Sequence, residues 1–359
     1  MFPFHSRVFI FLFIGLFLMS SFQNCAPIGS TEQTQGQTNT AAGTPSPQTP
    51  NPPLIPIPVP DSSIPLAEKI AATNQTAKTN SLCTQLGDFY WEIGDEQGAM
   101  GSGMVGSTYT GTTSIPIASA SKFVFGAFML QLTNGNLTSV QKSALRMLSG
   151  YSGLNPIKCA SSTTVANCLT LSSGPNYKFL PAEVGQFHYD GAHDEFFAAN
   201  SLANGGLEIG SYTTAQLNNL VFPTLGISPG FSYAFPLLAG GISASPNQFA
   251  IFLRAILSRQ LVMYNFLGAD PVCTLVGASC PTAASSPSTV AWHYSYNHWV
   301  EDDSQGDGTF SSPGAFGFYP WISADKKTYG IISRHSSGGF ASSQCGTKLR
   351  KAWNTGVAQ

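Results

Sequence analysis

Residues 115–130 read IPIASASKFVFGAFML, and the prediction of the fold starts from this segment. Every position from residue 123 to residue 130 is apolar or glycine, so a helix there has no polar face and is expected to be buried. Ser119 and Lys122 stand three residues apart just before this run. If the helix begins at Ser119, the i,i+3 spacing places both side chains on one face.

Lys122 is nearly the only cation in this apolar segment. Burial disfavours the charged form of a lysine and lowers its pKa, which makes the amine usable as a base at neutral pH. A serine at a helix N-terminus lies beside unpaired N–H groups, and its own amide can stabilise an oxyanion. The pair is therefore typical of an activated serine nucleophile. The alternative is that Ser119 or Ser121 only caps the helix, since Ser-x-x-Lys is short enough to recur by chance.

Helix and strand patterns surround this segment. Strands are predicted at 88–94 and 100–109, around a turn at 95–98, and again at 316–323 and 328–333. Helices are predicted at 66–79, 139–148, 194–202, 214–221, 246–257 and 345–353. Strands near both ends with helices between them predict an α+β body whose sheet is completed by both ends.

The composition restricts the class of partner. The chain has 359 residues, of which 43% are hydrophobic and only 9% are charged, and its net charge is −2. A nucleic-acid binder normally shows a basic stripe or a high pI, so we expect no nucleic-acid partner. The hydrophobic content also argues against a charge-driven disordered protein.

The N-terminus carries an export pattern, in which Arg7 precedes an apolar run over residues 8–19. A basic start and a run too short for a membrane span are typical of a secretory signal. Residues 1–24 are similar to a bacterial lipoprotein signal, after which Cys25 becomes the lipidated first residue, although Phe22 and Asn24 depart from the usual pattern. The alternatives are a secreted chain without lipid, or an uncleaved anchor, with Cys25 incidental.

Residues 25–65 are rich in Pro, Thr and Gln and carry only Glu32 and Asp61 as charges. Such a segment cannot bury enough apolar surface to fold, and its Pro-rich part is expected to be extended. We therefore expect a signal peptide (1–24), a tether (25–65) and a folded domain (66–359). The protein is expected to be exported to the bacterial cell envelope, facing the periplasm or the outside, with a lipid anchor in a membrane.

Six further cysteines follow Cys25, and an even number in an exported chain indicates disulfides. Proximity in sequence favours two short loops and leaves a third pair that joins the ends of the domain. The predicted pairs are Cys159–Cys168, Cys273–Cys280 and Cys83–Cys345. The alternative of a metal site is disfavoured, because the sequence has no CxxC and no histidine at ligand spacing near these cysteines. We expect no metal and no cofactor.

Four segments, in this order, resemble those of the class C β-lactamase-related serine hydrolases, a group of penicillin-binding proteins, D-aminopeptidases and esterases. Residues 117–123 are similar to the nucleophile segment and residues 187–192 to a Tyr-x-Asn segment. Residues 239–253 are similar to a helix-starting AGG-x-x-S stretch, and residues 314–326 to a late hairpin. The resemblance covers residues 80–359. It implies a β-lactamase/transpeptidase-like fold, with an antiparallel sheet flanked by the terminal helices and an all-helical subdomain.

The resemblance also implies roles for three side chains. Ser119 would be the acylated nucleophile, Lys122 its partner, and Tyr189 a second base that passes the proton to the leaving group. A tyrosine works in this way only beside a cation, which favours the phenolate.

The chain departs from the family pattern in two places. Gly191 stands where the family has Asn, two residues after the tyrosine. The third motif falls near Ser311 and Ser312, without the usual Lys or His, and backbone N–H groups there are expected to complete the oxyanion hole. Its rival, residues 335–339, follows the last predicted strand and is interpreted as a connecting loop.

Both departures affect recognition of a substrate carboxylate, which favours an esterase or amidase over a true β-lactamase. We expect an exported serine hydrolase that forms an acyl-enzyme on Ser119 and acts on a small ester or amide, or on a peptidoglycan-related substrate. The alternative is a non-catalytic or penicillin-binding cell-envelope protein on the same fold, similar to a D,D-peptidase.

The remaining polar groups receive structural interpretations. Four histidines near aromatic residues are expected to be hydrogen-bonded structural groups, the second two on a half-buried strand: His188, His193, His293 and His298. Three acids without regular calcium-ligand spacing are expected to form a solvated surface loop: Asp302, Asp303 and Asp307.

Overall fold

The computed structural model describes residues 63–201, 205–227 and 230–359. The predicted signal peptide, the lipidation candidate Cys25 and the tether up to residue 62 lie outside the described residues. Within the described ranges, no helix has both the length and the apolar content that crossing a membrane requires.

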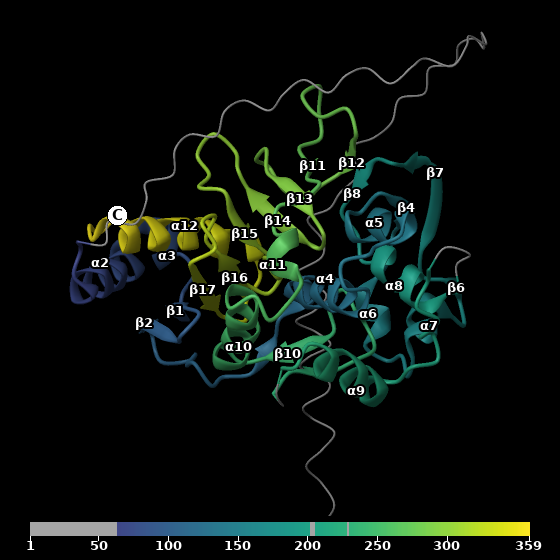
Figure 1. Ribbon diagram of the computed structural model, residues 1–359, viewed down its shortest axis with the longest axis horizontal. Helices are drawn as coiled ribbons and strands as arrows, with labels where there is room; N and C mark the ends of the chain where they lie inside the picture. Colours follow the sequence, from purple (N-terminus) through teal and green to yellow (C-terminus); the bar gives the residue numbers. More distant parts are fainter. Residues whose placement is uncertain (1–62, 202–204, 228–229) are drawn as a thin grey trace, which may run out of the picture. The chain divides into compact units, whose positions relative to one another are not determined.

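An eight-stranded antiparallel sheet forms the centre of the domain, in the order β11-β13-β14-β15-β16-β17-β1-β2 (Figure 1). The first strand, β1, pairs with the last, β17, and places Trp91 opposite Ile332. The sheet is therefore completed by both ends of the domain, as predicted. Its strands are β1 (Phe89–Asp95), β2 (Ala99–Val105), β11 (Val272–Cys273), β13 (His293–Ser295), β14 (His298–Glu301), β15 (Thr309–Ser311), β16 (Tyr319–Ile322) and β17 (Thr328–Ser333).

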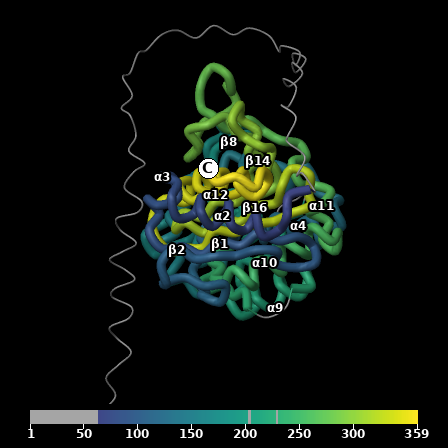
Figure 2. Tube along the Cα trace, turned by 90° about the vertical axis from the view of Figure 1, so that its left-hand side faces the viewer, coloured from purple at the N-terminus to yellow at the C-terminus, as the bar shows by residue number. Residues whose placement is uncertain are grey.

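Helices cover both faces of this sheet. Neighbouring residues of a strand point to opposite faces, so alternate residues pack against different helices. In β17, Ile332 packs in a cluster with the terminal helices α2 (Leu66–Thr79), α3 (Ser81–Thr84) and α12 (Gly339–Thr355). Its neighbour Ile331 packs in the larger core on the other face. In Figure 2, α2 and α12 lie in front of the strands, on the side that faces the viewer.

The other helices and the short strands build the second face and a mostly helical subdomain at the right of Figure 1. The helices are η1 (Ala118–Ala120, a 3-10 turn), α4 (Ser121–Leu132), α5 (Ser139–Leu145), α6 (Pro156–Cys159), α7 (Val165–Leu169), α8 (Ala192–Ala199), α9 (Thr214–Thr224), α10 (Pro246–Leu257) and α11 (Met263–Phe266). The short strands are β3 (Ile115–Pro116), β4 (Ser149–Ser152), β5 (Thr170–Leu171), β6 (Gly174–Pro175), β7 (Lys178–Val184), β8 (Phe187–His188), β9 (Ser232–Tyr233), β10 (Ile242–Ala244) and β12 (Ala283–Ser285).

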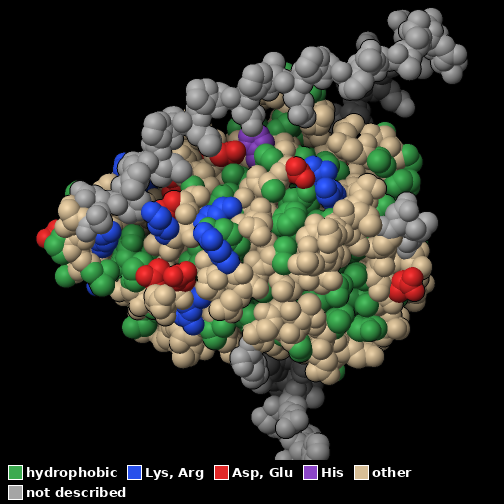
Figure 3. All heavy atoms as spheres, in the orientation of Figure 1, with side chains coloured by type: hydrophobic (Ala, Val, Ile, Leu, Met, Phe, Trp, Pro, Cys, Tyr) green, Lys and Arg blue, Asp and Glu red, His purple; other side chains and the backbone are tan. Residues whose placement is uncertain are grey.

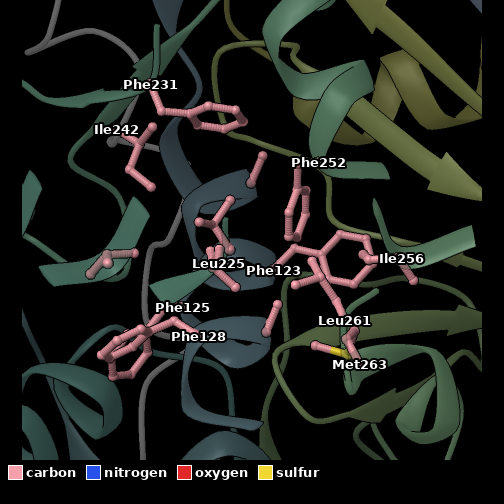
Figure 4. Packing of buried hydrophobic residues seen from close by; sticks show 14 of the residues in the cluster. Phe123, Phe125, Phe128, Leu225, Phe231, Ile242, Phe252, Ile256, Leu261 and Met263 are labelled. Carbon is pink, nitrogen blue, oxygen red and sulfur yellow. The ribbon is translucent and has the colours of Figure 1, made fainter. Parts of the chain in front are cut away.

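Helix α4 runs through the core, as its sequence predicts. Every residue from Ser121 to Leu130 is buried. Figure 4 shows Phe123 of α4 beside Phe252 of α10, and the two rings meet edge to face with their centroids 5.6 Å apart. A Cβ atom at Gly126 would lie 2.8 Å from Tyr296 O, so only glycine allows this close approach of helix and hairpin. The helix is therefore fixed on all sides by packing.

Most predicted elements appear, and the differences are local. The predicted ranges 66–79, 246–257 and 328–333 coincide with α2, α10 and β17. The predicted tail helix, 345–353, begins six residues earlier, at Gly339. The predicted single strand around His293 and His298 is wrong, because the chain reverses at Asn297, whose φ of 60° places it in the left-handed region.

Three disulfides pair the six cysteines of the domain in the predicted pattern. Cys83–Cys345 joins α3 to α12, Cys159–Cys168 joins α6 to α7, and Cys273–Cys280 closes the loop after β11. Disulfides of this kind are typical of proteins that fold in an oxidising compartment.

A buried ion-pair network connects the sheet to α12. Arg350 donates from Nη2 to Glu301 (2.7 Å) and from Nε to Asp307 (2.8 Å), and the Glu301 side chain is only 1% exposed. Tyr319 and Ser311 donate their hydroxyls to Glu301 Oε1. Burial raises the pKa of Glu301, against the opposing effect of Arg350. We refer to Glu301, Asp307 and Arg350 as the charged network.

The predicted solvated acidic loop is thus a wrong interpretation. Asp307 belongs to the charged network, Asp303 accepts a hydrogen bond from Trp292 Nε1 at 3.0 Å, and Asp302 lies 2.8 Å from His293 Nδ1. These acids fasten the β14–β15 connection to its neighbours. On the face shown in Figure 3, charged side chains gather over the sheet and terminal helices at the left and are sparse over the helical subdomain at the right.

Candidate active site

The turn that carries Ser119 is held from two sides. Strand β3, just before it, pairs with β10, and Ile117 donates its N–H to Ile242 O at 3.0 Å. On the other side, a Cβ atom at Gly314 would lie 2.1 Å from Ile117 O, so the chain after β15 passes directly against the turn. Ala118 has a φ of 47°, a left-handed conformation that costs free energy for a residue with a side chain. Strain of this kind occurs preferentially at functional sites.

Ser119 and Lys122 lie together, as their spacing predicts. The helix proper begins at Ser121, so Ser119 stands on the preceding 3-10 turn η1 and not on the α-helix. Lys122 Nζ lies 3.3 Å from Ser119 Oγ, and the lysine is only 4% exposed. Nζ also donates to Ala239 O at 3.1 Å. The amine is therefore within reach of the serine proton.

Tyr189 is the third residue that the resemblance implied, and it lies beside Lys122. Lys122 Nζ stands 5.0 Å from the centre of the Tyr189 ring. The ring packs against Trp299 and Tyr294, with centroids 5.2 Å and 5.8 Å away. Tyr189 also donates its N–H to Ser285 O at 3.0 Å. The structure therefore brings the serine, the lysine and the tyrosine into one place.

Gly191, which stands at the asparagine position of the family pattern, lies close to two neighbouring side chains. A Cβ atom at this position would lie 2.9 Å from Leu154 Cδ2 and 3.1 Å from Ala239 Cβ. Asp190, one residue earlier, accepts hydrogen bonds from the backbone N–H groups of Gly153 and Leu154. The Tyr-x-Asn position is therefore filled by neighbouring side chains, and a larger residue there would displace them.

The two serines of the third motif point in different directions. Ser312 donates its hydroxyl to Ser119 O at 3.1 Å and lies against the turn. The Ser311 hydroxyl instead donates a hydrogen bond to Glu301 Oε1, in the charged network. The Ser312 N–H donates to Pro320 O, the next residue is Pro313, which has no N–H, and the Gly314 N–H donates to Phe318 O. These amides do not provide the second oxyanion donor that the sequence led us to expect.

Two buried acids behind the site were not singled out from the sequence. Asp194 and Glu195 are fully buried in the first turn of α8. Burial raises the pKa of Asp194 to about 7, against the lowering effect of Lys122 and of the Asn297 hydrogen bond. Burial also raises the pKa of Glu195 to about 8. The sequence does carry a signal for their burial, because the two consecutive acids lie within a mostly apolar run, AHDEFFAA.

The histidines have the structural roles that the sequence suggested. His193 is fully buried between Ser149 Oγ, 2.6 Å from Nδ1, and His188 O, 2.8 Å from Nε2. Burial lowers the pKa of His193 to about 3 and that of His298 to about 4. His293 is different, because its hydrogen bond to Asp302 raises its pKa.

These shifts predict that the protein loses stability as pH rises from 6.5 to 8.5. The folded state keeps protons on Asp194 and Glu195 that the unfolded chain releases near pH 4, so the free energy of unfolding falls as these groups titrate. The slope is about 1.4 kcal/mol per pH unit for each retained proton. His193 and His298 affect the free energy of unfolding only below pH 6.5. There the unfolded chain protonates these histidines, whereas the folded protein, with its lower pKa values, keeps them neutral.

Urea unfolding at both pH values checks this prediction. His293 titrates in the same direction, so the informative comparison is with the double variant Asp194→Asn/Glu195→Gln, which should lose less stability over this range than the wild type. Equal losses in the two proteins would contradict burial of protonated acids.

Comparisons with known proteins agree on the fold. No family model and no curated protein matches the sequence. Among solved structures, the octameric penicillin-binding protein homologue from Pyrococcus abyssi matches with 14% identity and a TM-score of 0.55, over 82% of this chain and 76% of that one. A D-stereospecific amidohydrolase from Streptomyces sp. matches with 12% identity and a TM-score of 0.53, over 82% and 100%. A β-lactamase from Mycobacterium bovis matches with 11% identity and a TM-score of 0.52, over 74% and 93%. The domain therefore has the β-lactamase/transpeptidase-like fold that the sequence motifs implied.

Proposed function

We propose that this protein is a serine hydrolase that forms an acyl-enzyme on Ser119 and hydrolyses an ester or amide. The observation that carries the proposal is the 3.3 Å approach of Lys122 Nζ to Ser119 Oγ at the start of a buried apolar helix. Solved structures that share the fold include the amidohydrolase and the β-lactamase named above, which supports a hydrolase.

The geometry supports a two-step reaction. Neutral Lys122 takes the hydroxyl proton of Ser119 while Oγ attacks the substrate carbonyl. The N–H of Ser119 and the N-terminal dipole of the helix stabilise the developing oxyanion. Lys122 and Tyr189 then pass the proton to the leaving alcohol or amine, and the acyl group stays on Oγ. A water molecule attacks the ester in the second step and restores the serine.

The surroundings favour a substrate without an essential carboxylate. Gly191 supplies no side-chain amide. The segment at the end of β15 has Phe310, Ser311 and Ser312, and none of these side chains is a cation that could bind an anionic substrate. We therefore place esters and amides before penicillins. A peptidoglycan-related substrate remains the second class.

Intact-mass measurement with a fluorophosphonate tests the proposal. The wild type should gain one adduct on Ser119, and Ser119→Ala should gain none. Ser121→Ala is the matched control, because the Ser121 hydroxyl accepts a hydrogen bond from the Ile242 N–H inside the core, and this variant should still react. A wild type that stays unmodified would refute the proposed nucleophile.

One observation favours the alternative of a penicillin-binding or non-catalytic protein on this fold. The N–H of Ser312, one of the two residues where a second oxyanion donor is expected, donates to Pro320 O instead, and loss of one such donor slows hydrolysis by about 10²–10³-fold. Slow release would leave a long-lived acyl-enzyme. A benzylpenicillin adduct that persists for hours would support this alternative, and rapid turnover of short-chain esters would exclude it.

We further propose export of the protein and anchoring to a membrane through lipid on Cys25. The three disulfides support folding in an oxidising compartment. Incorporation of a labelled fatty acid into the wild type but not into Cys25→Ala would support the anchor. Equal labelling of the two proteins would refute it.

A further inference from the structure

A small apolar cluster lies beside the candidate active site. Its buried members are Leu237 and the disulfide between Cys159 and Cys168, and its partly buried members are Leu154 and Phe235. Leu154 comes from the loop after β4, whereas Phe235 and Leu237 come from the loop between β9 and β10. We refer to these five residues as the apolar cluster.

The loop between β9 and β10 brings the apolar cluster close to the catalytic candidates. Ala239 O, in this loop, accepts the hydrogen bond from Lys122 Nζ at 3.1 Å. A Cβ atom at Gly240 would lie 3.2 Å from Leu237 Cδ2 and 3.9 Å from the carbonyl carbon of Ala118, in the turn that carries the candidate nucleophile. Leu237 and this turn therefore both lie close to Gly240.

Leu154 reaches the same place from the side of Tyr189. A Cβ atom at Gly191, two residues after the tyrosine, would lie 2.9 Å from Leu154 Cδ2 and 3.1 Å from Ala239 Cβ. Gly191 has no side chain that could separate Leu154 from the site. The apolar cluster therefore adjoins the segments that carry the serine, the tyrosine and the acceptor of the lysine.

The carboxylate nearest to Leu154 in this segment is already paired. Asp190 Oδ1 accepts from the N–H groups of Leu154 and Ala192, at 3.2 Å and 2.8 Å. Asp190 Oδ2 accepts from the Gly153 N–H at 2.9 Å. Both oxygens are thus satisfied by the backbone, and an apolar group that comes to lie on Leu154 does not cost the carboxylate a hydrogen bond.

Leu154 and Phe235 are partly exposed, so the apolar cluster presents side-chain surface to solvent. Removal of apolar surface from water is favourable and needs no directional partner. Sites for small molecules are lined mainly by apolar side chains, with a few polar groups that fix the orientation of the ligand. Here Ser119 and Lys122 supply the polar groups, and Leu154 and Phe235 supply apolar surface beside them.

We propose that the apolar cluster binds an apolar group of the substrate, and that Leu154 and Phe235 determine specificity for this group. The inference rests on the proposed function, in which Ser119 attacks an ester or amide. The substrate class is then an ester or amide that carries a hydrocarbon chain or ring next to the scissile bond.

The rate at which Ser119 is labelled by fluorophosphonates with ethyl, butyl, hexyl or octyl chains tests the inference. Each rate is divided by the rate at which hydroxide hydrolyses the same probe, which corrects for intrinsic reactivity. The wild-type rate should rise by up to about fourfold for each added CH2 group, because burial of one such group contributes about 0.8 kcal/mol. The hexyl probe should therefore label the protein at least about tenfold faster than the ethyl probe.

Two variants remove the apolar surface. Leu154→Asn and Phe235→Gln should each reduce the ratio of the hexyl rate to the ethyl rate to less than about threefold. Leu154→Met keeps an apolar side chain and should retain the wild-type ratio. Leu132→Asn is the matched control, since Leu132 is 47% exposed at the far end of α4 and should leave the ratio unchanged.

The ratio of rates separates specificity from a structural role. A purely structural role of Leu154 or Phe235 would slow all four probes by the same factor. Equal wild-type rates for the four probes would overturn the inference without any substitution, and so would unchanged ratios in both variants. A wild type that no probe labels would instead refute the proposed function.

Two series of esters distinguish the acyl part of the substrate from its leaving part. p-Nitrophenyl esters from acetate to octanoate vary the acyl chain, and acetates of alcohols from ethanol to octanol vary the leaving group. A chain-length dependence that Leu154→Asn weakens in the first series assigns the apolar cluster to the acyl part. The same result in the second series assigns it to the leaving part, and the absence of a dependence in both would contradict the inference.

Discussion

Replacement of Lys122 by methionine should slow the labelling and hydrolysis reactions at Ser119 by about 10³-fold, within the range for loss of a general base. Methionine has nearly the length of lysine and fills the same space, but it has no group that can take the serine proton. Lys122 is only 4% exposed, so its replacement by an apolar side chain should not lower the free energy of unfolding. Activity and stability should therefore separate in this variant.

Stopped-flow hydrolysis of an activated ester, together with the fluorophosphonate rate, measures this effect. The matched control is Lys142→Met, which removes a partly exposed lysine from α5 and should keep nearly wild-type rates. A Lys122→Met rate within threefold of the wild type would show that another group activates Ser119.

Replacement of Arg350 by methionine should lower the free energy of unfolding by about 3–5 kcal/mol, the usual cost of leaving a buried partner charge uncompensated. Arg350 Nη2 lies 2.7 Å from Glu301, and Nε lies 2.8 Å from Asp307. Without the guanidinium, Glu301 keeps only the hydroxyls of Ser311 and Tyr319 and must take up a proton or be destabilised.

Urea unfolding checks this loss, and Arg259→Met is the control, because Arg259 lies over the Tyr264 ring at the surface and should cost less than about 1 kcal/mol. The double variant Glu301→Gln/Arg350→Met removes both charges and should recover part of the loss. A single-variant loss below about 1 kcal/mol would mean that Glu301 is already protonated in the folded protein.

The features that local chemistry determines could be predicted from the sequence. An uninterrupted apolar run predicts a buried α4. The three-residue spacing of Ser119 and Lys122 predicts their contact, although the structure places Ser119 on the 3-10 turn just before the helix. Short loops between cysteines predict two of the disulfides. The third pair, Cys83–Cys345, follows because only two cysteines remain.

The features that depend on distant neighbours could not be predicted. Asp194 and Glu195 stand where acids commonly cap the first turn of an exposed helix, and only packing of α8 against the rest of the domain buries them. Asp307 stands among other acids in a loop, and its partner Arg350 is 43 residues away in the chain. Whether the N–H of Ser312 is free to bind an oxyanion depends on the neighbouring strand β16, whose Pro320 O accepts a hydrogen bond from it. Each of these features depends on tertiary contacts, which the periodicity of the sequence does not encode.

The pairing of β1 with β17 has a consequence for the biogenesis of the protein. The disulfide between Cys83 and Cys345 spans 262 residues, and β1 cannot fill its place in the sheet until β17 has been synthesised. Contacts this distant in sequence form late and slow the folding of a domain. The growing chain therefore has no route to its complete structure during translation. If the chain is exported as proposed, it would cross the membrane before its sheet is complete, and β1 would pair with β17 only after the last helix had followed.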